Sequence, residues 1–380
     1  MNTAQRIDAL CEVLAANQEL TDGVWRAALH AVPRHLFVPD RAWAAADDGP
    51  GYAIDRELRP EAWMDAAYAD HPIITQLDDG ATDVTTGDGH YTSSLSAPGV
   101  VVEFLEILDP YDGDRVLEIG TGTGWTAALL AHRLGDGNVT SVEIDKEVHA
   151  AAADNLATAG LSPRLILGDG AEGRPDGAPY DRVHVTCGVS RVPYAWVEQT
   201  RPGGIIVLPW MPEFEGGHKV ALTVGRDGRA IGRFAYRGAA YMMLRAQRPP
   251  GWEYAGDYRK STATLDPRRV LRAGTGLDVA VAGMLPGVSA VTDHSDGFEV
   301  WLSDGESGAW VSGDEVNQYG PRSLWDELEE VFFTWVGWGN PARDRFGLTV
   351  APDGQRVWLD SPDNPLSPVR PTAVRPPLFQ

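Results

Sequence analysis

Cysteine is scarce in this sequence, and so are the residue clusters that hold metals. Only two of the 380 residues are cysteines, Cys11 and Cys187, which is too few for a disulfide framework. No group of cysteines and histidines has the spacing of a zinc site. The nearest candidate for a metal cluster is the run DHSD, Asp293 to Asp296, which lies among turn residues. The sequence therefore predicts neither a disulfide scaffold nor a metal centre.

Basic charge and long apolar runs are also lacking. Lysine and arginine total 32 against 54 aspartates and glutamates, a net charge of −22, and basic runs such as Arg268 to Arg272 are short. Nucleic-acid enzymes usually need a basic stripe to neutralise phosphates. No apolar run reaches the roughly 18 to 20 residues of a membrane helix, and the N-terminus lacks a signal-peptide pattern. We expect a soluble cytoplasmic protein with no nucleic-acid or membrane partner.

The length of the chain suits two domains. Residues 1–85 look mostly helical, residues 86–246 alternate apolar strands with helices and close with a β-rich section, and residues 247–380 carry short strands and one strong helix. Alternating strands and helices indicate a parallel sheet covered on both faces. We therefore expect an α/β fold with a Rossmann-like sheet, an N-terminal helical subdomain and a smaller C-terminal α+β domain.

A glycine-rich loop joins one of these strands to a helix in the stretch DRVLEIGTGTGWTAALLA. Gly120, Gly122 and Gly124 follow the strand that ends at Ile119. Glycines permit a sharp turn and close approach to a ligand, and the helix start adds free N–H groups. The dinucleotide fingerprint is G-x-G-x-x-G, whereas Trp125 stands here at the third glycine. We expect a nucleotide-like cofactor, with NAD as the alternative.

Acidic residues at three successive strand ends narrow the choice of cofactor. Glu118, two residues before the first glycine, favours a cationic ligand such as S-adenosylmethionine over a pyrophosphate. Glu143 suits the ribose hydroxyls and Asp169 the adenine amino group. VLEIGTGTG thus resembles motif I of the class I methyltransferases, with S-adenosylhomocysteine as product. The predicted cofactor-binding residues are Glu118, Gly120, Thr121, Gly122, Thr123, Gly124, Glu143, Ile144, Asp169, Gly170 and Thr186.

Further motifs resemble one methyltransferase family over about residues 1–245. They are VPRHLFVP (32–39), AYADHPI (67–73), SLSAP (94–98), GDG with PYDRVHVT, and VPYAWVEQTRPGG. In this order they are similar to the protein-L-isoaspartate O-methyltransferases. The resemblance implies methyl transfer to a side-chain carboxylate of a peptide, usually isoaspartate. A carboxylate with a pKa of about 4 is already ionised at neutral pH and needs no general base.

The same resemblance assigns roles around the serine motif. It implies that Ser96, with Ser94 nearby, lies beside the methyl donor and the acceptor carboxylate. Helix capping is the structural alternative for both serines, and a structural ion pair or hydrogen bond is the alternative for Arg34 and His35. Cys187 is expected to be a small buried residue rather than a nucleophile. The predicted substrate-binding residues are Thr92, Ser93, Ala97, Pro98, Gly99, Arg34 and His35.

Two features depart from the family pattern. The chain continues for about 135 residues past Arg245, and the segment before the serine motif, residues 74–93, is expanded. Both resemble a subgroup that tailors ribosomally made peptides such as lanthipeptides, lasso peptides and graspetides. There an Asp is methylated, and the ester cyclises to an aspartimide that can open to isoaspartate. We expect tailoring of a modified precursor peptide, recognised by the C-terminal domain; the alternatives are repair of isoaspartate and a non-catalytic peptide-binding protein.

Overall fold

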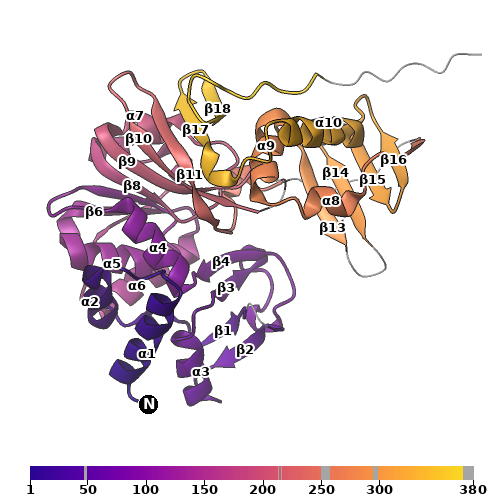
Figure 1. The fold of residues 1–380 in the computed structure, drawn as a ribbon. Coiled ribbons are helices and arrows are strands. Elements are labelled where there is room, and N and C mark those ends of the chain that lie inside the picture. Colours follow the sequence, from indigo (N-terminus) through magenta and orange to yellow (C-terminus); the bar gives the residue numbers. More distant parts are fainter. Residues whose placement is uncertain (47–48, 213, 215, 250–256, 294–297, 371–380) are drawn as a thin grey trace, which may run out of the picture. The chain divides into compact units, whose positions relative to one another are not determined.

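The computed structural model describes residues 1–46, 49–212, 214, 216–249, 257–293 and 298–370. The chain divides into two compact units (Figure 1). The first unit comprises residues 1–187 and 195–208, and the second comprises residues 188–194 and 209–380. This division differs from the boundary expected near residue 247, because strands on both sides of that residue pair with each other in the second unit.

A parallel sheet forms the centre of the first unit. Its strands follow the spatial order β9-β8-β5-β6-β7, and each neighbouring pair is parallel. All residues of β5 and β6 are buried, including the polar Thr140, Ser141 and Glu143 of β6. The strands are β5 (Val116–Ile119), β6 (Val139–Glu143), β7 (Arg164–Leu167), β8 (Tyr180–Val185) and β9 (Thr200–Trp210). The predicted α/β fold with a Rossmann-like sheet is confirmed.

The strand order reverses direction beside β5, between β6 and β8. Ligands of open α/β sheets bind at the carboxyl ends of the strands at such a reversal. Helices that follow or precede these strands pack on the sheet, with α4 against β8, α5 against β6 and α6 against β7. The helices are α4 (Pro98–Leu108), α5 (Trp125–Leu134), α6 (Lys146–Thr158) and α7 (Tyr194–Glu198). The glycine-rich loop therefore lies at the place where a cofactor is expected.

The N-terminal part of the first unit contains a second sheet besides its helices α1 (Thr3–Ala16), α2 (Gly23–Ala31) and α3 (Pro60–Ala67). Its antiparallel strands follow the order β2-β1-β3-β4. They are β1 (Arg41–Ala44), β2 (Tyr52–Asp55), β3 (Ile73–Leu77) and β4 (Tyr91–Leu95). The expected helical subdomain 1–85 omits this sheet, and its boundary cuts the hairpin of β3 and β4. The expanded segment 74–93 forms most of that hairpin, with short 3-10 turns at its tip.

The second unit contains two antiparallel sheets. One has the order β18-β17-β11-β10 within this unit, and the other has the order β12-β16-β15-β14-β13. The first is formed by β10 (His218–Val224), β11 (Ala230–Gly238), β17 (Phe346–Ala351) and β18 (Gly354–Leu359). The second is formed by β12 (Arg259–Thr262), β13 (Ser289–Asp293), β14 (Glu299–Ser303), β15 (Gly308–Ser312) and β16 (Glu315–Tyr319).

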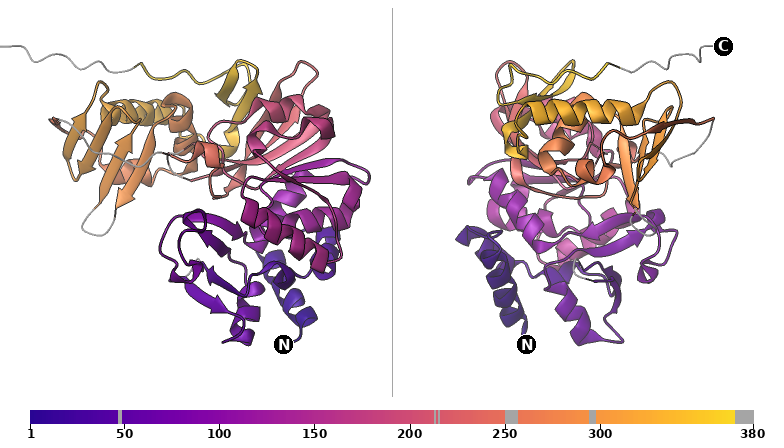
Figure 2. Two further views of the ribbon diagram at one scale, coloured as in Figure 1. Left: turned by 180° about the vertical axis from the view of Figure 1, so that it is seen from behind. Right: turned by 45° about the vertical axis from the view of Figure 1, so that its right-hand side comes forward.

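Helices cover the five-stranded sheet of the second unit. α10 (Leu324–Gly337) lies across β14, β15 and β16 (Figure 2), and α9 (Thr275–Met284) packs against α10. The short helix α8 (Pro267–Leu271) precedes α9. Trp325 is 1% exposed and Trp335 is 6% exposed. These two tryptophans therefore form the core of the unit, not a surface for binding.

Candidate functional site

The glycine-rich loop is held tightly between β8 and the β3–β4 hairpin. Gly120 has φ +91°, and a Cβ there would lie 2.6 Å from the Thr186 hydroxyl oxygen. Gly122 has φ +55°, and a Cβ there would lie 3.2 Å from the carbonyl oxygen of Ser94. Both the left-handed backbone and the lack of space require glycine. Of the predicted cofactor residues, Gly122 therefore lies beside the serine motif, and Thr186 lies beside Gly120.

Glu143 ties this loop to the end of β6. One carboxylate oxygen accepts the N–H of Gly122 at 2.9 Å, and the other accepts the N–H of Asp145 at 3.0 Å. The side chain is 8% exposed. Burial raises the pKa of Glu143, while the backbone N–H groups act in the opposite direction. The carboxylate thus lies at the loop, where a ribose would be held.

Apolar side chains at the next strand ends are open to solvent. Ile144 is 40% exposed after β6, and Leu167 is 49% exposed at the end of β7. Asp169 follows β7, is half-buried, and accepts the N–H of Ala171 at 2.9 Å. An apolar surface beside a carboxylate suits an adenine ring and its amino group. Leu167 was not predicted, because nothing in the sequence shows which apolar residue of a strand stays exposed.

The end of β8 completes this edge of the sheet. Burial raises the pKa of the Cys187 thiol to about 12, with a smaller contribution from the negative charges of Glu143 and Asp169. The ends of β6, β7 and β8 therefore converge, as predicted from the sequence. The thiol stays protonated at neutral pH, which makes a nucleophilic role unfavourable.

Glu118 is enclosed by its neighbouring strands instead of facing the open loop. It is fully buried, and one carboxylate oxygen accepts the hydroxyl of Ser141 at 2.5 Å. The other oxygen lies 3.9 Å from Nδ1 of His184 and has no hydrogen-bond partner among the described residues. The hydroxyls of Ser141 and Thr121 are 2.6 Å apart. The contact of Glu118 with a cationic cofactor stays a prediction.

In the hydroxyl-rich stretch from Thr92 to Ser96, some hydroxyls are hydrogen-bonded and others are free. The Thr92 hydroxyl donates to the Gln76 side-chain carbonyl at 2.9 Å, and the Thr75 hydroxyl donates to Ser93 at 3.1 Å. Within the described part of the chain, the hydroxyls of Ser94 and Ser96 form no hydrogen bond, and both residues are half-buried. The two serines predicted to be catalytic are therefore those with free hydroxyls.

The capping role expected for Ser96 is wrong. The N-cap of α4 is Ala97, and no side chain caps the helix there. Asp70 instead accepts the N–H of Gly99 at 2.8 Å. Pro98 does occupy the first turn, where its missing N–H costs nothing.

The predicted substrate surface is also smaller than expected. Pro98 and Gly99 are buried, and a Cβ on Gly99 would collide with the carboxylates of Glu19 and Asp70. Pro98 and Gly99 therefore form the start of α4. Of Ala97, Pro98 and Gly99, only the half-buried Ala97 remains accessible to a substrate.

Arg34 has a structural role in place of the predicted contact with a substrate carboxylate. It is 1% exposed, and its guanidinium donates to five backbone carbonyls. These belong to Ala67, Ala69, His71, Leu95 and Ser96, at 2.9 to 3.3 Å. The guanidinium also lies 5.5 Å from the ring centre of Trp125. Burial lowers the pKa of Arg34 to about 9, so it stays charged at neutral pH and fixes the backbone of the serine motif.

His35 is engaged as well. Its Nδ1 lies 2.6 Å from the hydroxyl of Tyr68, and burial lowers the pKa of His35. Burial raises the pKa of Tyr68 to about 12, so the phenol is the donor at neutral pH. Neither Arg34 nor His35 offers a free positive charge to a substrate here.

Gln76 connects the hairpin to the cofactor edge. Its side-chain N–H₂ lies 3.4 Å from the carboxylate of Asp145, and its carbonyl accepts the hydroxyl of Thr92. Asp145 directly follows Glu143 and Ile144 and caps α6. The expanded segment therefore forms a wall beside the edge where Glu143 lies. The sequence carried no signal for Gln76, a polar residue within a short strand.

Two other predictions concern groups outside this site. Of the candidate metal run, His294 to Asp296 lie outside the described residues; elsewhere in the described chain no group of three or more His, Cys, Asp or Glu residues has metal-binding geometry. No helix in the described ranges combines the length and apolar character needed to cross a membrane.

The family model and the curated relatives point to the same family. Residues 52–231 match the family described as protein-L-isoaspartate(D-aspartate) O-methyltransferase. The chain is 32% identical over 211 residues to protein-L-isoaspartate O-methyltransferase 2 of Archaeoglobus fulgidus, covering 55% of this chain and 80% of the relative. It is 36% identical over 185 residues to the protein-L-isoaspartate O-methyltransferase of Methanopyrus kandleri, covering 48% of this chain and 66% of the relative. These alignments span about half of the chain.

A solved structure titled protein-L-isoaspartate O-methyltransferase extends the likeness of the fold. It covers 93% of this chain and 100% of its own length, with a TM-score of 0.55 and 19% identity. The likeness in fold between this chain and that structure therefore extends well beyond the parallel sheet. Our expectation that a C-terminal extension marks the peptide-tailoring subgroup is not supported.

The family also decides between the two cofactors considered, in favour of S-adenosylmethionine over NAD. The relationship is shown by the A. fulgidus relative, of which 80% is matched at 32% identity. The chain belongs to the protein-L-isoaspartate O-methyltransferase family of S-adenosylmethionine-dependent carboxyl O-methyltransferases.

Proposed function

We propose that the first unit methylates the side-chain carboxylate of an aspartate-derived residue in a peptide, and that isoaspartate is the preferred acceptor. The observation that supports this most is that the backbone of the serine motif, whose Ser94 and Ser96 hydroxyls form no hydrogen bond within the described residues, meets the glycine loop. The carbonyl oxygen of Ser94 lies 3.2 Å from the Cβ position of Gly122. The named relatives support isoaspartate as the acceptor.

The strand-end edge fits S-adenosylmethionine. Glu143 offers carboxylate oxygens to the ribose hydroxyls, Asp169 lies at the adenine side, and Ile144 with Leu167 offers exposed apolar surface. Because Gly120 and Gly122 have no side chains and no space for any, the backbone of the loop can lie close to a ligand at the strand ends. When bound, the cofactor supplies an electrophilic methyl group on its sulfonium.

The side chains of this chain then have to position an acceptor and keep it reactive. A carboxylate is ionised at neutral pH, so no general base is required. The hydroxyls of Ser94 and Ser96 donate to the carboxylate and orient it without neutralising it, as a bound cation would. Arg34 acts as a positioning residue, because it fixes the carbonyls of Leu95 and Ser96. Such orientation is worth up to ~7–11 kcal/mol of the barrier.

The second candidate is methylation of an ordinary Asp in a constrained peptide, as in the tailoring of ribosomally made peptides. The observation that favours it is the folded hairpin formed by the expanded segment, which narrows access beside Glu143 through Gln76 and Asp145. In this reaction the backbone nitrogen of the next residue attacks the methyl ester. The C–N bond forms, methanol leaves, and the product is an aspartimide that water can open to isoaspartate.

One experiment compares the two acceptors and tests for catalysis. The protein is incubated with methyl-labelled S-adenosylmethionine and three peptides: a linear isoaspartyl peptide, a linear Asp peptide, and a macrocyclic Asp peptide. Turnover of the isoaspartyl peptide alone supports the proposal. Turnover of the macrocycle alone, with loss of methanol, supports tailoring. Binding of S-adenosylhomocysteine and peptide without any methyl transfer would show a non-catalytic peptide-binding protein and would overturn both.

A further inference from the structure

A groove in the second unit joins basic and apolar side chains. It has a volume of about 740 Å³ and lies between α8 with the loop that follows it and α10. One wall carries Arg268, Arg269 and Arg272, and the other carries Phe333 and Val336. This is the short basic run that the sequence showed and that the methyl transfer does not use.

The positive charge of this groove is local and unusual for the chain. Against a net charge of −22, no acidic residue occurs between Pro267 and Leu277. The one acidic residue that lines the groove, Asp266, forms an ion pair with Arg268 at 2.6 Å. Arg269 and Arg272 are exposed and have no ion-pair partner among the described residues. Two arginines are therefore free to meet a negatively charged ligand.

Glu329, a carboxylate of α10 one helical turn before Phe333, is already engaged. Glu329 accepts the N–H groups of Thr264 and Leu265, the hydroxyl of Thr264 and the indole N–H of Trp325. It lies partly buried and does not line the groove. An acidic ligand therefore meets two uncompensated arginines there.

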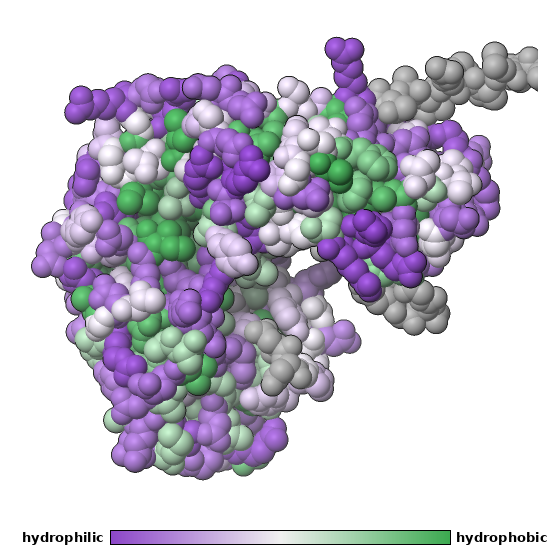
Figure 3. Space-filling model, viewed as in Figure 1, coloured by the Kyte–Doolittle hydropathy of each residue, from purple (hydrophilic) through white to green (hydrophobic). Residues whose placement is uncertain are grey.

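The apolar wall is exposed without a described partner covering it. Phe333 is 55% exposed and Val336 is 43% exposed, three residues apart on one face of α10. Behind them, Phe332 and Trp335 are buried and form the core contact. Figure 3 shows hydrophobic surface in the part of the second unit where Figure 1 labels α10, with hydrophilic surface next to it. Exposed aromatic surface rimmed by charge is typical of a peptide-binding site.

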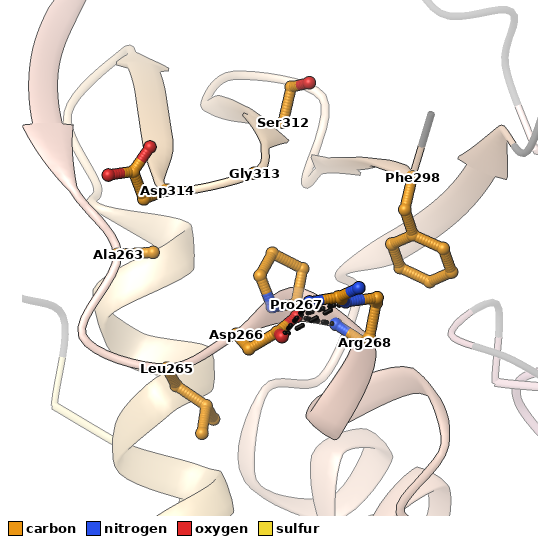
Figure 4. A pocket seen from close by; sticks show the side chains of 9 residues that line it. All are labelled: Ala263, Leu265, Asp266, Pro267, Arg268, Phe298, Ser312, Gly313 and Asp314. Atoms are coloured by element: carbon orange, nitrogen blue, oxygen red, sulfur yellow. Dashed lines mark hydrogen bonds and ion pairs between the residues drawn. The ribbon is translucent and has the colours of Figure 1, made fainter. Parts of the chain in front are cut away.

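A second cavity continues the groove. Its volume is about 570 Å³, and it shares Leu265, Asp266 and Arg268 with the first. Figure 4 shows Asp266 and Arg268 paired at the centre of this cavity, with Phe298 to one side. Two adjoining cavities with three residues in common suit an extended segment of several residues.

From these observations we infer that the groove between α8 and α10 binds an acidic segment of the peptide substrate that also carries apolar side chains. Its carboxylates pair with Arg269 and Arg272, and its apolar side chains lie against Phe333 and Val336. The role as a substrate site rests on the proposed function, whereas the binding itself does not. The aromatic wall and the net charge of −22 favour a peptide over a nucleic acid.

Direct binding is measured on the full chain by fluorescence anisotropy. The probe is a fluorescein-labelled peptide of alternating Glu and Leu, and its neutral counterpart has Gln in place of Glu. Arg269→Glu combined with Arg272→Glu is expected to weaken binding at least tenfold, and Phe333→Ser about fivefold. Arg226→Glu, at an exposed arginine of the same unit outside the groove, is the matched control and should change binding less than twofold.

Three results would overturn the inference. They are equal binding of the Gln peptide, an equal loss in the Arg226→Glu control, or tighter binding of an oligonucleotide with the same dependence on Arg269 and Arg272. Because all three arginines are exposed, the variants are expected to fold, and an unchanged thermal unfolding temperature checks this.

Catalysis then separates this inference from the proposed function. The Glu/Leu segment is attached to an isoaspartyl peptide through Gly/Ser linkers of several lengths, which raises the effective concentration of the acceptor. The segment should lower KM about tenfold for the unsubstituted protein but not for the doubly substituted one, with kcat unchanged. No methylation of either peptide would refute the proposed function alone, while equal KM values at every linker length would refute the groove.

Discussion

The candidate binding surfaces of the two units carry side chains of opposite charge. In the first unit, the carboxylates of Glu143 and Asp169 lie at the strand ends beside exposed Ile144 and Leu167. In the second, Arg269 and Arg272 lie beside exposed Phe333. Hydrogen-bond acceptors suit ribose hydroxyls and an adenine amino group, whereas free guanidinium groups suit peptide carboxylates. The difference indicates that the cofactor and the recognition segment of the substrate bind to separate units.

The largest effect is expected from the arginine that the first unit buries. Arg34→Ala would leave five backbone carbonyls without their donor and should lower the free energy of unfolding by about 3–5 kcal/mol. Urea unfolding followed by tryptophan fluorescence measures this loss. Arg272→Ala is the matched control, since its exposed side chain should contribute less than about 0.5 kcal/mol. Equal losses for the two variants would remove the distinction between a structural and a free arginine.

The next effect concerns the cofactor edge. Glu143→Ala removes the acceptor for the ribose and for the N–H groups of Gly122 and Asp145. We expect the affinity for S-adenosylhomocysteine to fall by about 1–3 kcal/mol, measured by calorimetry. The double variant Arg269→Glu, Arg272→Glu should bind this ligand normally, because its substitutions lie in the other unit. If both variants lose affinity, the separation of the two binding sites is wrong.

The parallel sheet could be predicted because its signals are local. Apolar stretches such as VLEI in β5 and IIVLP in β9 mark two of its strands, and the glycine loop and strand-end acids follow from the residues next to them. The antiparallel sheet of the first unit lacks such signals, since no glycine loop follows β1 or β2 and the order β2-β1-β3-β4 depends on pairing between strands. Strand pairing across many residues is also invisible in sequence, as with β11 and β17, and this is why the boundary near residue 247 was misplaced.

The same distinction, between signals from neighbouring residues and contacts between distant elements, explains which features of the candidate site could be predicted. Glu143, Asp169 and the serine motif could be located from their neighbours in the chain. The burial of Glu118 and Arg34 could not, because it depends on partners contributed by other elements, such as Ser141 and the carbonyls of residues 67–71. Ser96 illustrates the second case, since its supposed cap contact does not form.

A third effect should appear in acid and should come mainly from the second unit. His218 is fully buried beside Trp210 and Phe234, and burial, with a smaller contribution from the charge of Arg343, lowers its pKa to about 3. The unfolded chain takes up this proton below about pH 6.5, but the folded unit does so only near pH 3. Stability therefore falls as the pH drops from 6.5 towards 3, by on the order of 2 kcal/mol at pH 5.

His218→Phe should remove that loss, because a phenyl ring fits the aromatic cluster and does not titrate. Urea midpoints at pH 5 and pH 7.5 measure the difference between the two proteins. His132→Gln, at an exposed histidine of the first unit, should leave the slope unchanged. A pH slope that survives in His218→Phe would assign the acid sensitivity to other groups. His35 of the first unit acts in the same direction, because burial lowers its pKa as well, and it is unchanged in both proteins.

The smallest effect tests the serine hydroxyls themselves. Ser96→Ala removes one free donor to the acceptor carboxylate, so kcat for the isoaspartyl peptide should fall about tenfold, while affinity for S-adenosylhomocysteine stays the same. Ser93→Ala is the control, because its hydroxyl already accepts a hydrogen bond from Thr75 within the hairpin. That variant should lose some stability but keep its kcat. An unchanged kcat in Ser96→Ala, on linear and macrocyclic peptides alike, would mean that the free Ser96 hydroxyl does not orient the acceptor. The cofactor edge would then account for catalysis without the serine motif.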